Sequence, residues 1–253
     1  MLAALITDPW FYAVAIPAVF VFGVSKGGFG GGLGVLGVPL MSLAVSPIQA
    51  AAILLPILCF MDIISTRVFW KRWSTFELWV VLPAAVLGIV LGTMVFSFLS
   101  EALIRLIVGV VAVTFTLYHY ASKLAGKAHA TWPPWAGRIA GAIAGFTSFV
   151  AHSGGPPVDM YLLRRPLDKT TFVGTTAFFF LVVNYVKLIP YAWLGQFDTT
   201  NLVTSVVLFP VAAAGVLSGY WMHRRVSDGV FFGLVYLLLL VVGIKLIADG
   251  LTG

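Results

Sequence analysis

Polar residues that could bind an ion interrupt an otherwise apolar chain at three places. The first is Ser25 and Lys26, at the head of the glycine-rich segment SKGGFGGGLG, residues 25–34. So many glycines predict a broken helix, because each one weakens a helix by about 1 kcal/mol. The free N–H groups and the dipole at the start of the next helical part attract anions. We expect such backbone groups at Gly28, Gly30, Gly31 and Gly32.

This glycine-rich segment is also compatible with a purely structural role. Gly28 and Gly32 have the small-xxx-small spacing of closely packed membrane helices, so the glycines would serve packing alone. Lys26 would then extend along its helix to the membrane surface. The segment is not a nucleotide-binding loop, since no strand precedes it and its lysine comes before the glycines. A lysine at membrane depth is costly and usually functional, which favours a binding role for Lys26.

The second place is the segment TSFVAHSGGPP, residues 147–157. Its glycines, Gly154 and Gly155, match Gly31 and Gly32 of the first segment. Its hydroxyl and imidazole groups would donate hydrogen bonds to the same cavity, and we include Ser148, His152 and Ser153. His152 has an equally plain role as a buried, hydrogen-bonded histidine. Ser153 next to His152 does not have the spacing of a nucleophile elbow, so intramembrane hydrolysis is a weak alternative.

The third place is a pair of matching positions within apolar runs, Asp62 and Asn184. A buried carboxylate can be held neutral and can release a proton when its surroundings change, so Asp62 is a candidate for proton coupling. The alternative is an ion pair with Arg67 or Lys26 that only holds the structure. Lys187 follows Asn184 on roughly the same helical face and is included as a binding residue.

The composition indicates which kind of secondary structure carries these residues. Apolar residues make up 60% of the 253-residue chain and charged residues 9%, against roughly a quarter in soluble domains. Runs of about twenty apolar residues recur, which is the length that crosses a bilayer. The fold class is therefore all-α, a polytopic membrane protein. The formal net charge of +6 comes from short loops, which indicates cytoplasmic loops and not nucleic-acid binding. We expect no cofactor and no metal.

The apolar runs predict ten helical segments. They cover residues 9–25, 33–45, 47–68, 75–98, 101–121, 135–151, 156–164, 169–190, 199–222 and 227–249. In each half the first two runs are too short for two complete crossings. We expect each pair to be a re-entrant or broken helix pair with its tip near the bilayer midplane. Backbone at such a tip must be buried in protein or line a cavity.

The ten segments form two similar halves. Pro83, Gly88, Gly92, Ser100 and Glu101 recur at one spacing as Pro210, Gly215, Gly219, Ser227 and Asp228. Gly23 and Asp62 likewise recur as Gly145 and Asn184 at a slightly shorter spacing. We predict a first repeat over residues 1–121, a cytoplasmic linker over 122–137 and a second repeat over 138–253.

The basic residues predict that the second repeat is inverted. By the positive-inside rule the loops that carry them are cytoplasmic, and they hold Arg67, Lys71, Arg72, Lys123, Lys127, Arg138, Arg164, Arg165, Lys169, Arg224 and Arg225. The remaining turns and both termini lie outside. Corresponding loops thus fall on opposite faces in the two halves. Inverted repeats of this kind are common in transporters.

Three motifs resemble the sulfite exporter TauE/SafE family. They are SKGGFGGGLGVLGVPL, the PIL-x-x-x-D run that ends at Asp62, and the N-x-x-K-x-x-x-Y-x-x-x-G run from Asn184 to Gly195. The resemblance extends over nearly the whole chain. It implies a permease of the bacterial inner membrane for sulfite, organosulfonates or related small anions. The second tip departs from the pattern, since it has HSGGPP in place of a glycine run.

These observations together predict a secondary transporter of small anions such as sulfite, sulfonates or sulfonated carboxylates. The expected partners are the anion, the lipid bilayer and protons, without nucleic acid; the oligomeric state is open. The substrate would bind between the two tips, and one half would rock against the other. The alternative is a cation/proton antiporter that uses Asp62 and Asn184. Lys26 argues against it, because cation sites avoid a nearby positive charge.

Overall fold

The computed structural model describes residues 5–30, 32–96, 98, 100–124, 131–162, 164–225 and 228–252, and no strand occurs among them. The helices follow the predicted segments closely. They are α1 (Pro9–Gly28), the 3-10 helix η2 (Gly32–Leu36), α2 (Gly37–Met41), α3 (Pro47–Val68), α4 (Thr75–Phe96), α5 (Glu101–Leu124), α6 (Pro134–Ala151), α7 (Gly155–Leu162), α8 (Lys169–Trp193), α9 (Thr199–His223) and α10 (Asp228–Thr252). Five of them, α1, α3, α4, α8 and α9, are long and apolar enough to cross a membrane. The chain is thus an all-helical, multi-pass membrane protein.

Local sequence explains where several helices begin. Pro9 and Pro47 stand in the first turn of α1 and α3, where the missing N–H group costs little. Asp168 caps α8 by accepting hydrogen bonds from the N–H groups of Thr170 and Thr171. These bonds and one from the Thr171 hydroxyl lower the pKa of the Asp168 carboxyl. Asp198 caps α9 in the same way.

The first helix pair returns to the end of the bundle where it began. The indole Nε1 of Trp10, in the first turn of α1, donates a hydrogen bond of 3.4 Å to the carbonyl of Leu43, just after α2. This contact shows that the pair forms a hairpin, and its two arms are unequal. With 20 residues, α1 spans about 30 Å and is not a half-helix. The returning arm consists only of η2 and α2.

The sequence predicts that the tip of this pair lies near the middle of the bundle. In the structure it lies elsewhere. The carbonyl of Gly28 accepts a hydrogen bond of 2.7 Å from Nδ1 of His223, the last residue of α9. Gly30 has a positive φ of 82° and lies against the ring of Phe172, in the first turn of α8. The tip thus reaches one end of the helices. Our expectation failed because α1 continues for three residues beyond the predicted segment.

The second pair has the same unequal form. The 18 residues of α6 lead through His152–Gly154 to the eight-residue α7. His152 ends α6 in the left-handed conformation, with φ of 51°. At the spacing that relates Asp62 to Asn184, His152 matches Gly30, so both tips turn through a residue of positive φ. A side chain is rarely placed in this conformation, which suggests that the imidazole itself is needed there.

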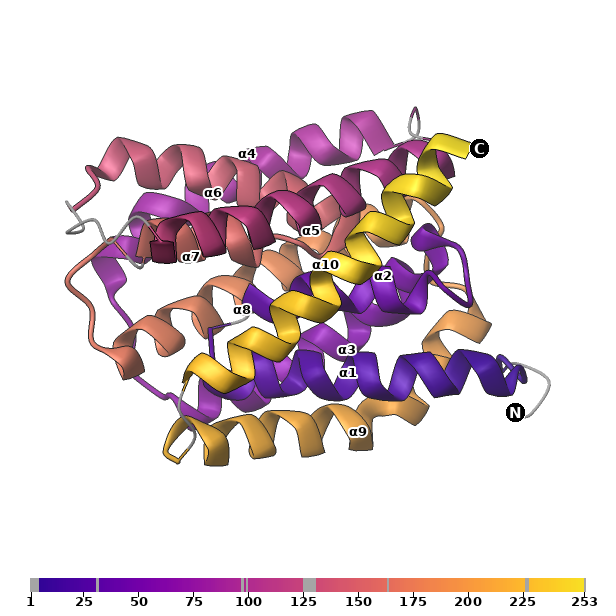
Figure 1. Ribbon diagram of the computed structural model, residues 1–253, viewed down its shortest axis with the longest axis horizontal. Helices are drawn as coiled ribbons and strands as arrows, with labels where there is room; N and C mark the ends of the chain where they lie inside the picture. Colours follow the sequence, from indigo (N-terminus) through magenta and orange to yellow (C-terminus); the bar gives the residue numbers. More distant parts are fainter. Residues whose placement is uncertain are drawn as a thin grey trace.

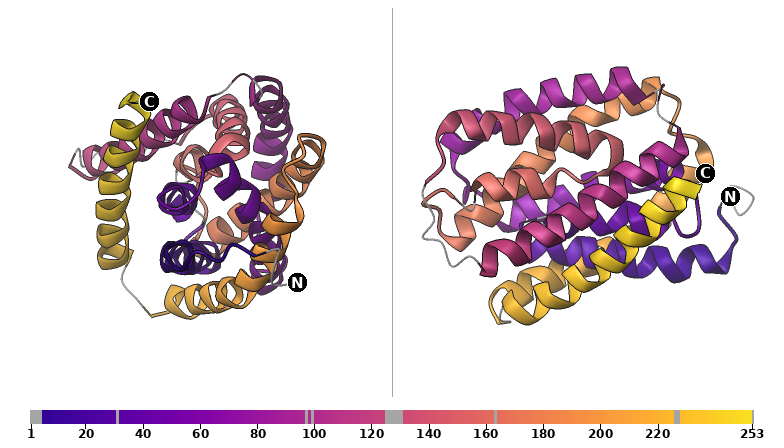
Figure 2. Two further views of the ribbon diagram at one scale, coloured as in Figure 1. Left: turned by 90° about the vertical axis from the view of Figure 1, so that its right-hand side faces the viewer. Right: turned by 45° about the horizontal axis from the view of Figure 1, so that its top comes forward.

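The two halves pack by pairing helices of the first half with helices of the second. The most extensive contacts join α1 to α9, α4 to α6, and α5 to α10. Glycines allow the backbones of the first two helix pairs to touch. A Cβ added at Gly23 would lie 2.9–3.0 Å from the carbonyl oxygen of Ala212 and the backbone of Gly215. A Cβ added at Gly145 would lie 1.9 Å from the carbonyl oxygen of Ala85. Figure 2 shows α1 inside the bundle, and α10 crosses its outside obliquely (Figure 1).

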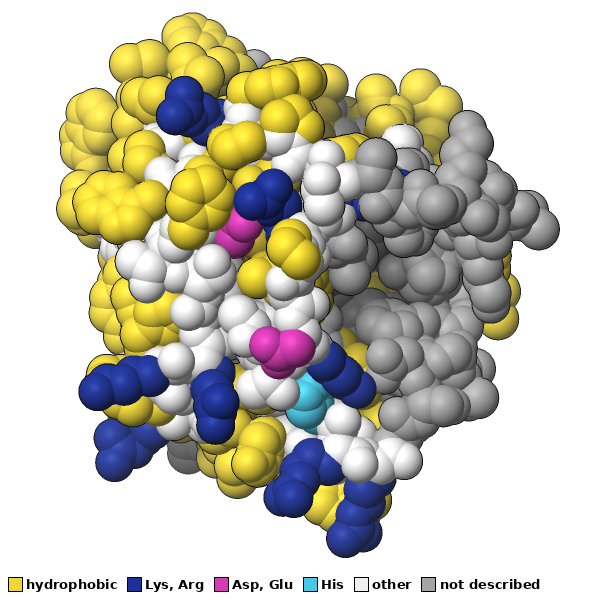
Figure 3. All heavy atoms as spheres, turned by 90° about the vertical axis from the view of Figure 1, so that its left-hand side faces the viewer, with side chains coloured by type: hydrophobic (Ala, Val, Ile, Leu, Met, Phe, Trp, Pro, Cys, Tyr) yellow, Lys and Arg dark blue, Asp and Glu magenta, His cyan; other side chains and the backbone are white. Residues whose placement is uncertain are grey.

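The two ends of the bundle differ in charge. The described chain begins and ends at the same end, on the right in Figure 1. Lys and Arg side chains gather at the opposite end, which Figure 3 shows face on. We call it the basic end; exposed or half-buried residues of three loops supply it, namely Lys71, Arg72, Arg164, Arg165, Lys169, Arg224 and Arg225. The contacts of Ser74 with Thr175 and of Lys169 with His223 join these loops.

Candidate functional site

Four of the predicted binding residues line one narrow pocket inside the bundle. Lys26, Ser148, His152 and Asn184 supply its polar wall. Phe22, Leu58 and Phe180 supply its apolar wall. The walls come from α1, α3, α6 and α8, so the pocket lies between the two halves of the chain. The pocket is too narrow to hold a water molecule. A ligand can therefore bind there only if the walls of the pocket move apart.

Lys26 and Asp62 form a buried ion pair at one side of this pocket. The ammonium of Lys26 contacts Oδ1 of Asp62, and the two side chains are 4% and 0% exposed. The amide of Asn184 donates a hydrogen bond of 2.6 Å to the other carboxylate oxygen. The Lys26 ammonium also lies 4.7 Å from the ring centroid of Phe180. Of the two ion pairs that the sequence suggested for Asp62, the structure has the one with Lys26.

Asn184, from the second half, contacts the Asp62 carboxylate of the first half and also lines the pocket. Its Nδ2 is used by Asp62, whereas its Oδ1 is buried and has no hydrogen-bond partner among the described residues. An unpaired buried acceptor costs about 1–3 kcal/mol unless water or a ligand satisfies it. Because Asn184 lines the pocket, a ligand that opens the pocket and donates a hydrogen bond to this oxygen would remove the cost.

Lys187 lies just behind the pocket, in a cluster with Ser148 and His152. Its Nζ donates to the carbonyl of Ser148 at 2.9 Å, to the Ser148 hydroxyl at 3.0 Å and to Nδ1 of His152 at 2.8 Å. The other imidazole nitrogen, Nε2, lies 2.8 Å from the carbonyl of Ala51. Since a carbonyl only accepts, Nε2 carries the proton and Nδ1 is the acceptor for Lys187. His152 is therefore both a satisfied buried histidine and part of the pocket wall.

The two clusters occupy related positions in the two halves, with different residues. At the spacing that relates Asp62 to Asn184, Ser148 matches Lys26 and Lys187 matches Ser65. Each half thus has one buried lysine, Lys26 on α1 in the first half and Lys187 on α8 in the second. The carboxylate is present in the first half only. The site is asymmetric in charge although its scaffold is similar in both halves.

The other predicted binding residues pack around the tips. Ser25 is buried, and Gly28 touches the backbone of Gly219. Ser153 donates its hydroxyl to the carbonyl of Ala151 and accepts a hydrogen bond from Thr147 at its own carbonyl. The remaining glycines lie beside these residues: Gly32 begins η2, Gly154 packs on Ser148 and Gly155 begins α7, whereas Gly31 lies outside the described residues. Close packing is therefore one use of these glycines.

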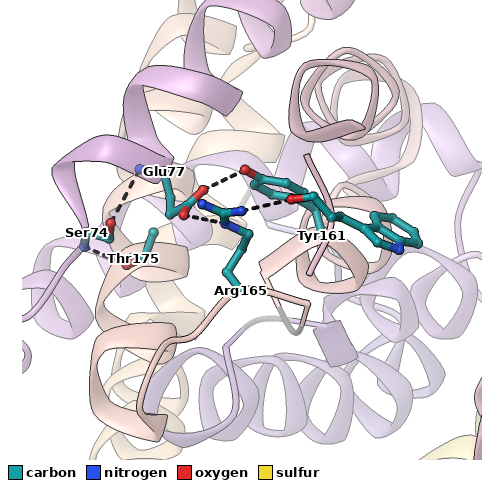
Figure 4. Close-up of polar contacts among 6 residues, drawn as sticks. Ser74, Glu77, Tyr161, Arg165 and Thr175 are labelled. Atoms are coloured by element: carbon teal, nitrogen blue, oxygen red, sulfur yellow. Dashed lines mark hydrogen bonds and ion pairs between the residues drawn. The ribbon is translucent and has the colours of Figure 1, made fainter. Parts of the chain in front are cut away.

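The sequence alone did not single out a second polar network, which lies at the basic end (Figure 4). The carboxylate of Glu77, in the first turn of α4, accepts hydrogen bonds from the Tyr161 hydroxyl at 2.7 Å and from Nε of Arg165 at 2.6 Å. Nη1 of Arg165 donates to the carbonyl of Trp132. The network ties α4 to α7 and to the segment before α6. Glu77 looks like an ordinary first-turn acidic residue in the sequence, so its partners could not be foreseen.

In the described part of the chain, no group of three or more His, Cys, Asp or Glu side chains comes together. Asp159 of α7 is buried and lies beside Thr176 of α8. Lys26 is the charged residue among those that line the pocket, with Asp62 and Lys187 beside it. Two lysines and one aspartate around the pocket suit an anion better than a cation.

Comparisons with known proteins place the chain in a family. The family model of the sulfite exporter TauE/SafE matches residues 15–246. A curated relative from Cupriavidus necator, the "Probable sulfite/organosulfonate exporter TauE", is 27% identical over 173 residues. The match covers 62% of this chain and 66% of the relative, slightly under two thirds of its length. No solved structure matches the chain. The chain belongs to the sulfite exporter TauE/SafE family of membrane transporters.

Proposed function

We propose that this protein is a secondary transporter that carries sulfite, organosulfonates or related small anions across the bacterial inner membrane. The surroundings of the pocket support this most directly, because buried Lys26 lines it, buried Lys187 lies directly behind its wall, and Asp62 pairs with Lys26 at its side. Ionisable residues buried within membrane helices mark substrate pathways, and positive ones suit anions. The family and the relative's printed name point to the same class of substrate.

We further propose that the scaffold is an inverted repeat of residues 1–121 and 138–253, joined by a linker at 122–137. The reciprocal pairing of α1 with α9 and α6 with α4 supports it, since these are corresponding helices of the two halves. The pocket between the halves would open alternately to the two sides as one half rocks against the other. The basic end would face the cytoplasm and both termini the outside.

Asp62 would couple transport to protons. Its carboxylate neutralises Lys26 in the closed pocket. An anion that takes Lys26 as its partner leaves Asp62 without a counter-charge in a low-dielectric site, where the protonated acid is favoured. Anion and proton would then cross together.

The proposal is tested by uptake of sulfite into proteoliposomes with the Lys26→Ala variant. We expect uptake to fall at least about tenfold, because removal of one partner leaves Asp62 buried as an unpaired negative charge in the anion site. Lys245→Ala is the control, since Lys245 is exposed on α10 and pairs with Asp249 of the same helix. Uptake by Lys26→Ala at the wild-type rate would overturn the proposed site.

The same assay separates the alternatives. A cation/proton antiporter built on Asp62 and Asn184 would show sodium- or potassium-dependent proton movement without any added sulfur anion. An intramembrane enzyme would need the Ser153 hydroxyl, which here donates to the carbonyl of Ala151. Full uptake by Ser153→Ala would exclude a serine nucleophile.

A further inference from the structure

The two buried lysines differ in what neutralises them. Lys26 has the Asp62 carboxylate in direct contact. Lys187 is 0% exposed, and its three hydrogen-bond partners are a carbonyl, a hydroxyl and an imidazole nitrogen. Three acceptors match the three N–H donors of an ammonium group. None of them carries a negative charge, so Lys187 is satisfied in hydrogen bonds but not in charge.

We infer that Lys187 is the residue that gives this pocket its preference for an anion, and that it acts through Ser148 and His152. This rests on the proposed function and refines it. Lys26 and Asp62 cancel each other's charge, so the pair is nearly neutral toward a ligand. No carboxylate is among the hydrogen-bond partners of Lys187, so a single negative charge on the substrate would stabilise its protonated form. The site therefore suits a monoanion.

The geometry shows how Lys187 reaches a ligand that it does not touch. Ser148 and His152 line the pocket, whereas Lys187 lies behind them. Because the Ser148 oxygen accepts a hydrogen bond from Lys187, its own hydroxyl proton is free to donate toward the pocket. In a low-dielectric interior the ammonium attracts an anion across this one intervening side chain far more strongly than it would in water. Lys187 is thus a positioning and charge-setting residue.

Asn184 and the Lys26–Asp62 ion pair indicate further properties of the substrate. The unpaired Oδ1 of Asn184 is an acceptor, so it suits a ligand or bound water that donates a hydrogen bond. A monoanion that still carries a hydroxyl, or one that binds with a water molecule, meets this requirement. A dianion requires one more positive charge, which becomes available when Asp62 is protonated.

Binding of two isosteric probes to the purified full-length chain tests the inference. Methanesulfonate is a monoanion, and dimethyl sulfone is a neutral molecule of nearly the same shape. We expect the wild type to bind methanesulfonate at least about tenfold more tightly than the sulfone, and Lys187→Met to lose most of that ratio. A purely structural Lys187 would instead weaken both probes equally. Lys187→Arg should keep part of the ratio, because the charge stays.

A control variant assigns the effect to Lys187. Lys245→Met removes a lysine that is exposed on α10 and pairs with Asp249, so we expect the ratio to stay within about threefold of the wild type. Persistence of the ratio in Lys187→Met, or an equal loss in Lys245→Met, would overturn the inference. If Lys187→Met does not fold, Lys187→Gln, which keeps hydrogen-bond donors without the charge, takes its place. A wild type without any preference for methanesulfonate would instead refute the proposed function.

Discussion

At the scale of single residues, the site depends on three buried groups that no lipid environment would tolerate unpaired. Asp62 contacts Lys26 and receives the amide of Asn184, and these bonds satisfy both carboxylate oxygens. The Nζ of Lys187 donates hydrogen bonds to Ser148 and His152. The sequence singled these residues out, and the structure brings Lys26, Ser148, His152 and Asn184 to one pocket with Asp62 and Lys187 beside it. The sequence could not show that Lys26 pairs with a carboxylate while Lys187 does not, because that depends on side chains from different helices.

Asp62→Asn tests the coupling role of the carboxylate. Asparagine keeps the size and a hydrogen-bonding oxygen but cannot bind a proton. We expect the variant to retain anion binding and to lose the stimulation of uptake by an inward proton gradient. Uptake measured with and without the gradient checks this, with Asp249→Asn on exposed α10 as the control. Unchanged stimulation in Asp62→Asn would rule out Asp62 as the proton carrier.

At the scale of helices, glycine contacts set how closely the two halves approach. Gly145 of α6 lies against the Ala85 carbonyl of α4, and Gly23 of α1 lies against the backbone of Gly215 in α9. A backbone atom cannot turn aside as a side chain can. These two pairs therefore fix the spacing of the helices that carry Lys26 and Ser148.

Gly145→Ala is expected to destabilise the protein by roughly 1–3 kcal/mol, because the added Cβ would lie 1.9 Å from the Ala85 oxygen and would force α4 and α6 apart. Thermal unfolding in detergent measures the change. The matched control is Ile143→Ala on the same helix, whose side chain is exposed on the surface of the bundle. Equal unfolding temperatures for both variants would show that this contact is not tight in solution.

Glu77→Gln tests the network that ties the helices together at the basic end. The change leaves Arg165 without its counter-charge, and we expect a loss of roughly 1–3 kcal/mol because Arg165 keeps some contact with water. Asp249→Asn, which breaks the exposed pair with Lys245, should cost less than about 1 kcal/mol. Equal thermal unfolding shifts for the two variants would mean that the Glu77 network adds no more than a surface pair.

The helices themselves were largely predictable from the sequence. Apolar runs placed α3, α8 and α9 to within three residues at each end. The length of α1 was underestimated, because the glycines after Lys26 suggested an earlier break. Helix propensity is local, whereas α1 continues to Gly28 because its glycines pack on α9. Positive φ at His152 was equally hidden, since it follows from how the tip is packed.

At the scale of the whole molecule, the chain has two ends of different chemistry. Both termini lie at one end, and the basic loops lie at the other. This arrangement agrees with an even number of passages through the bilayer. The positive-inside rule predicts that the basic end faces the cytoplasm.

A fusion of alkaline phosphatase to the C-terminus tests this orientation. The enzyme is active only when it is exported, so we expect an active fusion in a bacterial host. A fusion within the loop of Lys71 and Arg72 provides the control and should be inactive. An inactive but stably inserted C-terminal fusion would place the termini in the cytoplasm and contradict the proposed topology.

The central claim is that the closed pocket between the two halves binds a small sulfur oxyanion and opens alternately to each side. Counterflow in proteoliposomes measures this directly. Vesicles preloaded with unlabelled sulfite should accumulate labelled sulfite transiently, and methanesulfonate should compete. Label that enters no faster than into protein-free vesicles, from a protein that is folded and inserted, would contradict the claim.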